Sequence, residues 1–284
     1  MQPMQTFKLA LVSDLTPDGS EVIPAAELQG VSAAIQSQLN TDVGPQWGLS
    51  VTIDPFNILN EVPLDYWPIL VCKDIGDPDI EGVHKDPDHH PYALVTYDEY
   101  WSLTASHEAI EMVIAPEGNR QLFTAPPGSN DPSVEKVAYL IEPCDPVYSA
   151  EYGYPINGWL MSNFCYPSYY TLAGLPPYDK QGQLTAPRTL SPGGYVCYQD
   201  GAGDWIRWSM FDGNYDTTNF GKTPVMTSER SSLRSWLDRK TSKRLESLKV
   251  SSALKSRLQK KQPMRGRSEA RVKALRDHIK SLQS

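Results

Sequence analysis

Basic residues are scarce over most of this chain. Only eight of its 26 Lys and Arg residues lie within residues 1–221, whereas 29 of its 34 Asp and Glu residues lie there. Residues 222–284 therefore carry a net charge of +13 and the rest of the chain carries -21. This split indicates an acidic body followed by a basic tail. It also leaves few Lys or Arg side chains with which a buried acid of the body can pair.

Cysteines and long apolar runs are also few. The chain has four cysteines, and no two show CxxC spacing, so neither a Cys-based zinc site nor a disulfide framework is expected. Buried, reduced thiols are the expectation, with one or two bridges left open. No apolar run approaches 18 residues, and residues 1–11 lack a basic segment followed by a long apolar one. These absences favour a cytoplasmic protein without a transmembrane segment, with secretion by a non-classical route left open.

Residues 100–115 carry the most informative pattern of the chain. Their periodicity predicts a helix that ends before Pro116. At about 100° per residue, His107 and Glu111 lie one turn apart within a mostly apolar arc. A buried carboxylate needs a partner, and a metal ion satisfies both side chains at once. Glu108 lies about 100° round the helix from His107, so it points at the same cleft from its edge.

This spacing resembles the His-Glu-x-x-His helix motif of zinc peptidases, with Glu111 at the position of the second His. A carboxylate also binds zinc, so the resemblance implies zinc ligation by His107 and Glu111. It implies in addition that Glu108 is the catalytic general base. The alternative is a structural helix in which Glu111 pairs with a basic residue and His107 is a satisfied core histidine.

A catalytic zinc needs a third protein ligand. Residues 137–141 read as a strand that leads directly to Glu142, which we expect to be that ligand. Asp145 is the alternate ligand or an outer partner, although an acid before a proline is also typical of a turn. His84 and Tyr154 are the other candidates for supporting positions, Tyr154 because a phenol can donate to a developing oxyanion.

The order of expected elements points to a fold class. Strands are expected at residues 7–12, 49–53, 67–72 and 92–97, a helix at 24–39 and a closing hairpin at 193–208. A strand, a helix and three further strands thus precede the helix at 100–115. This order resembles the N-terminal half of zincin-type metallopeptidases, where a twisted sheet backs the metal-binding helix. The resemblance implies an α+β protein with an α/β-like N-terminal half and a zincin-like mixed sheet.

A longer pattern extends over residues 63–208. It comprises Ser106-His107-Glu108, Glu111-Met112, Glu142-Pro143-Cys144-Asp145, Ser162-Asn163-Phe164 and Pro192-Gly193-Gly194-Tyr195. The combination resembles a family of uncharacterised bacterial and phage-associated proteins that are regarded as zincin-like. Where that family usually has an acid, this chain has Tyr148. The resemblance implies a metal site and gives no substrate.

We therefore expect a zincin-like domain at residues 1–215, a linker at 216–230 and a basic, partly helical or disordered tail at 231–284. The expected function is zinc-dependent hydrolysis of a peptide or protein by a metallopeptidase. One alternative is a catalytically inactive binding or scaffold protein of the same fold. Another is a protein that binds nucleic acid or an anionic surface through residues 222–284.

Overall fold

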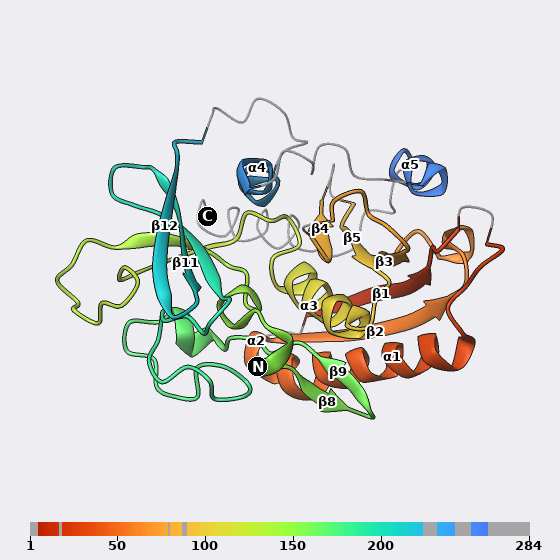
Figure 1. Ribbon diagram of the computed structural model, residues 1–284, viewed down its shortest axis with the longest axis horizontal. Helices are drawn as coiled ribbons and strands as arrows, with labels where there is room; N and C mark the ends of the chain where they lie inside the picture. The colour runs from red at the N-terminus through yellow and green to blue at the C-terminus, as the bar shows by residue number, and fades with distance from the viewer. Residues whose placement is uncertain are drawn as a thin grey trace, which may run out of the picture.

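The protein has an α+β fold built on two five-stranded sheets. The computed structural model describes residues 5–16, 19–78, 80–86, 90–223, 232–241 and 251–260. The two sheets lie on opposite sides of the molecule, with the helices α3 and α4 between them (Figure 1). The expectation of an α+β class is confirmed.

The first sheet is mixed and has the strand order β2-β1-β3-β5-β4. Its strands are β1 (Gln5–Ser13), β2 (Leu49–Phe56), β3 (Trp67–Cys72), β4 (Gly82–Lys85) and β5 (Tyr92–Thr96). Four of them run parallel, and β4 lies antiparallel to β5 at the edge. Successive side chains of β1 alternate between two cores, with Leu9 and Leu11 in one and Ala10 and Val12 in the other.

Helices cover both faces of this sheet. α1 (Ala25–Gln38) and α3 (Trp101–Ile114) contribute to the larger core, and α5 (Ser252–Leu258) contributes Leu254 to the smaller one. α1 buries Leu28, Val31 and Ile35, which recur at helical spacing. A π-helical turn (Leu39–Val43), the short α2 (Gly44–Trp47) and a 3₁₀ turn (Leu59–Glu61) complete the connections of the N-terminal half.

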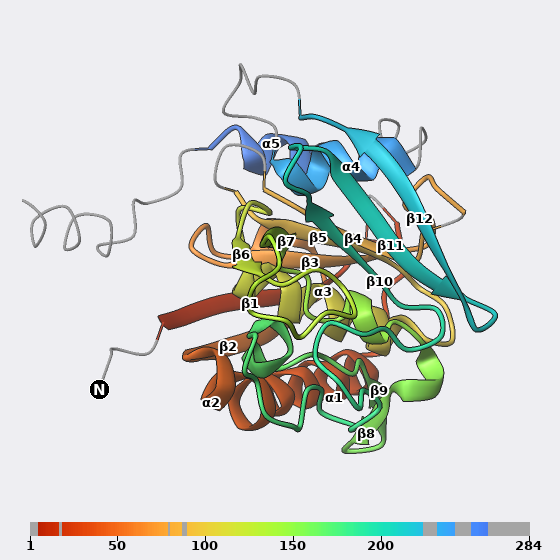
Figure 2. The ribbon, with the colours of Figure 1, turned by 90° about the vertical axis from the view of Figure 1, so that its left-hand side faces the viewer.

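The second sheet is antiparallel and has the order β12-β11-β10-β7-β6 (Figure 2). Its strands are β6 (Gln121–Thr124), β7 (Val137–Leu140), β10 (Tyr195–Gln199), β11 (Trp205–Phe211) and β12 (Asn214–Gly221). A small hairpin of β8 (Tyr154–Ile156) and β9 (Trp159–Met161) packs near α1 and α3. Because β12 pairs with β11 along its length, the linker expected at 216–230 is wrong for residues 216–221.

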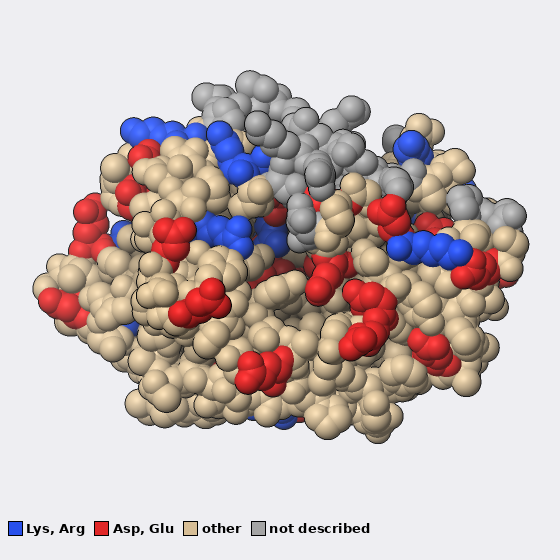
Figure 3. Space-filling model, viewed as in Figure 1, with Lys and Arg blue, Asp and Glu red and all other residues tan. Residues whose placement is uncertain are grey.

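Parts of the basic tail pack on the body. α4 (Leu233–Thr241) and α5 are described, whereas residues 224–231, 242–250 and 261–284 lie outside the described residues, and with them most of the segment predicted to contact nucleic acid. Most basic side chains visible in Figure 3 gather in the upper half of that face, the half in which Figure 1 shows α4 and α5. None of the described helices combines the length and apolarity needed to cross a membrane.

Candidate metal centre

The helix α3 supplies three of the candidate side chains from a wholly buried position. The Asp98 carboxylate accepts the Tyr100 N–H at 2.8 Å just before the helix begins. The helix ends at Ile114, two residues before Pro116, which cannot continue it. All its residues are buried, including the polar ones, so it has no solvent face. Its carboxylates must therefore be satisfied by groups from other elements.

His84 reaches this helix from the edge strand β4. Register with β5 places it opposite Ala93, and its side chain is 3% exposed. His84 Nδ1 lies 3.0 Å from Glu108 Oε2 and 3.7 Å from Glu111 Oε2. The first distance is that of a hydrogen bond, so His84 fixes the orientation of the Glu108 carboxylate. His84 was expected to support the site, and the structure brings it there.

The segment after β7 supplies Asp145 at the start of a 3₁₀ turn (Asp145–Val147). The Cys144 N–H donates to Glu111 Oε1 at 3.2 Å, which holds the turn against α3. Asp145 Oδ1 then lies 3.4 Å from His107 Nε2, and Glu111 Oε2 lies 3.4 Å from the same nitrogen. Within the described residues, these three form one of two groups of donors that converge closely enough to hold a metal ion.

The donor separations fit a tetrahedral ion. Zinc–ligand distances of about 2.0–2.1 Å place the ligand atoms of a tetrahedron about 3.3–3.4 Å apart. The two measured separations from His107 Nε2 match that spacing. The second group consists of His84, Glu108 and Glu111, and it uses the same Glu111 oxygen. Since Glu108 is hydrogen-bonded to His84 in that group, the group with His107 is the better metal site.

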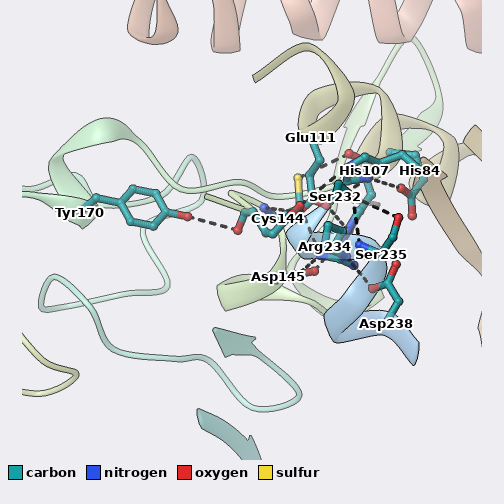
Figure 4. Close-up of polar contacts among 12 residues, drawn as sticks. His84, His107, Glu111, Cys144, Asp145, Tyr170, Ser232, Arg234, Ser235 and Asp238 are labelled. Carbon is teal, nitrogen blue, oxygen red and sulfur yellow. Dashed lines mark hydrogen bonds and ion pairs between the residues drawn. The ribbon is translucent and has the colours of Figure 1, made fainter. Parts of the chain in front are cut away.

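Glu142, expected to be the third ligand, lies beside His84 and Arg234. Its Oε2 is 3.9 Å from His84 Nε2 and 3.3 Å from Arg234 Nη1, and it belongs to neither group of converging donors. Arg234 comes from α4 and also contacts Asp145 Oδ2 at 3.1 Å (Figure 4). Among the described residues, the recorded ion-pair contacts of Glu111 are with His84 and His107, whereas Arg234 contacts Glu142 and Asp145.

Several buried polar atoms of the cluster lack a hydrogen-bond partner within the described part of the chain. They are His84 Nε2, Glu111 Oε2, both carboxylate oxygens of Glu142 and Asp145 Oδ1. A buried polar atom without any partner costs about 1–3 kcal/mol, and the 3.4 Å contacts of Glu111 Oε2 and Asp145 Oδ1 with His107 Nε2 are longer than an ordinary hydrogen bond. A cation beside Glu111 Oε2 and Asp145 Oδ1 removes this cost at two of them. The residues present therefore fit a metal ion.

The charges of the cluster respond to one another. Burial opposes the charge of His107, but Glu111 and Asp145 outweigh it and raise the pKa of His107 well above its usual value. Burial raises the pKa of Glu142 well above its usual value, although Arg234 acts in the opposite direction. Burial acts likewise on Asp145, but Arg234 and His107 together lower the pKa of its carboxyl. A metal bound by His107 displaces its proton, so metal affinity should fall as pH falls.

The cluster opens into a cleft of about 280 Å³ between β4, α3 and α4. Glu108 and His107 line its floor, and the Tyr148 ring stands edge-on to the His107 ring at a centroid distance of 5.7 Å. Wall residues that were not predicted as site residues include Glu81, Tyr148, Tyr195, Arg207, Arg234 and Asp238. The only available signal for the last two was the Arg/Asp pair one turn apart in a partly apolar basic segment.

Tyr154 does not belong to this cleft, so the expectation that it supports the site is wrong. Its hydroxyl donates to Asp42 Oδ2 at 2.9 Å and accepts from Gln38 Nε2 at 3.0 Å. These partners lie at the end of α1 and in the π-helical turn that follows it. The phenol therefore ties the β8–β9 hairpin to that turn, and Tyr148 is the tyrosine beside His107.

Gly82 sets how closely β4 approaches α3. A Cβ at this position would lie 2.5 Å from Thr104 Cγ2 and 2.8 Å from Glu108 Oε1. We expect Gly82→Ala to destabilise the fold by about 1–3 kcal/mol, because overpacking forces the strand and helix apart. Urea unfolding measures the change. The double variant Gly82→Ala/Thr104→Ser removes the nearer methyl and should recover part of the loss; wild-type stability in Gly82→Ala would contradict the close packing.

Comparison of the chain with models of protein families, with curated proteins and with solved structures found no match.

Proposed function

We propose that this protein is a zinc-dependent hydrolase, most simply a metallopeptidase with a zincin-like fold. One observation carries the proposal: Glu111 Oε2 and Asp145 Oδ1 each lie 3.4 Å from His107 Nε2, and both oxygens lack hydrogen-bond partners among the described residues. One imidazole nitrogen and two carboxylate oxygens form a set that suits zinc. The third ligand is then Asp145, the alternate of the sequence analysis, in place of Glu142.

Glu108 is the general base of the proposed reaction. Zinc held by His107, Glu111 and Asp145 would supply Lewis acidity that makes an attacking water more acidic. Glu108 lines the cleft next to His107 and is outside the donor set, so its carboxylate is placed to take a proton from the attacking water. It then delivers that proton to the leaving amine. His84 keeps the carboxylate in place through its 3.0 Å contact with Oε2.

The arrangement of the first sheet supports a zincin-like fold. The edge strand β4 runs antiparallel to its neighbour and packs against α3, so the cleft lies between an edge strand and the metal-binding helix. No strand was expected at residues 82–85, so this relation comes from the structure. It supports the fold analogy, whereas the function rests on the side chains.

Zinc content tests the proposal directly. The full-length protein, purified without chelator, is expected to hold one zinc ion per chain by elemental analysis. His107→Ala and Asp145→Asn should each weaken zinc binding by more than about 100-fold. This loss exceeds the usual effect of removing a residue that only hydrogen-bonds to a metal ligand. Glu142→Gln is the matched control, because it removes a buried carboxylate that lies outside the donor set. It should retain zinc.

Three results would change this conclusion. Wild-type protein without affinity for zinc would remove the proposal. Zinc loss in Glu142→Gln, with normal binding in Asp145→Asn, would restore Glu142 as the third ligand. A protein that binds zinc but cleaves no member of a broad fluorogenic peptide library would instead be a binding protein of the same architecture.

A further inference from the structure

The helix α4 of the basic tail is fixed to the body on the side of the metal centre. Its backbone begins on the loop after α3, where the Leu233 N–H donates to Asn119 Oδ1 at 2.6 Å and the Arg234 N–H donates to the Gly118 carbonyl at 2.9 Å. Its apolar side chains form a buried cluster with two strands of the second sheet. That cluster consists of Leu140, Trp205, Leu233, Trp236 and Leu237. The position of Arg234 is therefore set by packing and by two hydrogen bonds.

The Arg234 guanidinium is held at both ends. Its Nε lies 2.8 Å from Oδ1 of Asp238, one turn further along the same helix. Its Nη1 lies 3.1 Å from Asp145 Oδ2 and 3.3 Å from Glu142 Oε2. Figure 4 shows Arg234 between Asp145 and Asp238, with His107 beyond. Because Asp238 fixes one edge of the planar fork, the other edge is aimed at the two acids.

Arg234 and His107 contact different oxygens of Asp145. Oδ2 faces the guanidinium at 3.1 Å, and Oδ1 faces His107 Nε2 at 3.4 Å. The contact with Arg234 thus selects the carboxylate rotamer that presents Oδ1 to the donor set. It also places a positive charge beside the buried carboxyl of Glu142.

Arg234 stands beside the cation position and does not fill it. A guanidinium in the middle of the donor set would contact Glu111, the residue that both donor groups share. The ion pairs that Arg234 makes within the described residues are instead with Glu142, Asp145 and Asp238. Residues next to metal ligands commonly fix ligand orientation in this way, and their loss typically costs 10–100-fold in metal affinity.

We propose that Arg234 is a positioning residue of the metal centre, and that docking of α4 therefore completes the site. The inference rests on the proposed zinc site. If it is correct, α4 belongs to the metal centre, although the basic tail was expected to be separate from the domain. The helix acts through Asp145: Asp238 holds Arg234, Arg234 holds Asp145, and Asp145 presents one oxygen to the ion.

Zinc affinity of full-length variants tests this inference. Arg234→Gln is expected to weaken zinc binding by about 10–100-fold in competition with a chromophoric chelator. Asp238→Asn keeps the arginine but removes the ion pair that orients its guanidinium, so a smaller loss of zinc affinity is expected. Lys240→Gln removes the same charge from an exposed position on the same helix and should bind zinc as the wild type does. The visible spectrum of the cobalt-substituted protein should change in Arg234→Gln and not in Lys240→Gln.

Unchanged zinc affinity in Arg234→Gln would overturn the inference, and tighter binding would show that Arg234 competes with the cation. If Arg234→Gln does not fold, Asp238→Asn provides the test. Wild-type zinc affinity in that variant would contradict the proposal that Asp238 acts through Arg234 on Asp145. The proposed function is tested separately, because it would be contradicted by a wild-type protein that binds no zinc.

Discussion

Replacing Glu108 by glutamine is expected to leave zinc bound and to lower peptide hydrolysis by about 10²- to 10⁴-fold, the usual contribution of general acid–base catalysis. Glutamine has nearly the same shape, so it can still accept a hydrogen bond from His84, which lies 3.0 Å from Glu108 Oε2. It cannot take a proton from water. Because Glu108 lies outside the preferred donor set, the metal should stay in place. Parallel measurement of zinc content and turnover separates the two effects.

Glu99→Gln is the matched control, since Glu99 is an exposed acid in the turn that precedes α3. It removes the same charge and should keep wild-type turnover. Two outcomes argue against the assigned role. Loss of zinc from Glu108→Gln would place Glu108 among the ligands, in the group with His84 and Glu111. Wild-type turnover in Glu108→Gln would require another base.

Local sequence patterns predicted the elements with strong periodicity. The strand expected at residues 67–72 is β3, and the helix expected at 100–115 contains α3, which spans Trp101–Ile114. Continuous apolar runs and a proline after the helix carried these predictions. Short or polar strands were not predicted by the same reasoning. β4 (Gly82–Lys85) has four residues and contains a histidine, and β12 is mostly polar and exposed, so neither shows the usual alternation.

The candidate site was predicted in part, for a similar reason. His107, Glu108 and Glu111 lie on one helix, so their relative directions follow from the helical repeat. Glu142 and Asp145 follow the end of β7, and the irregular backbone between them decides which of the two side chains faces α3. That choice is made by the Cys144 N–H, which bonds Glu111 and brings the next residue to His107.

The contribution of α4 depends on tertiary docking. Arg234 is one of 18 basic residues after position 221, and its own neighbours in sequence do not distinguish it from the others. Its position follows from the start of α4, where the N–H groups of Leu233 and Arg234 donate to Asn119 and Gly118, more than 110 positions earlier. Charge patterning correctly separated a basic tail from an acidic body. It gave no indication that part of that tail would lie at the centre of the acidic cluster.

Zinc is expected to stabilise the folded protein strongly, because the cluster buries four carboxylates around two histidines and one arginine. A ligand at 1,000 times its dissociation constant adds about 4.1 kcal/mol to the free energy of unfolding. For a domain of this size, about 2–4 °C per kcal/mol gives a rise in Tm of roughly 8–16 °C. Circular dichroism during heating, with excess zinc and with chelator, measures that rise.

The variant His107→Ala separates specific stabilisation from other effects of zinc. It removes the nitrogen that both close carboxylate contacts share, and Glu111 and Asp145 then lose the donor that closes the set. The Tm difference between zinc and chelator should nearly vanish in this variant. It should persist in Glu142→Gln, whose carboxyl already has its pKa raised by burial and lies outside the set. Equal Tm values for the wild type with zinc and with chelator would mean that the cluster is neutralised by protons and Arg234 alone, and that its buried acids serve the fold and not a cation.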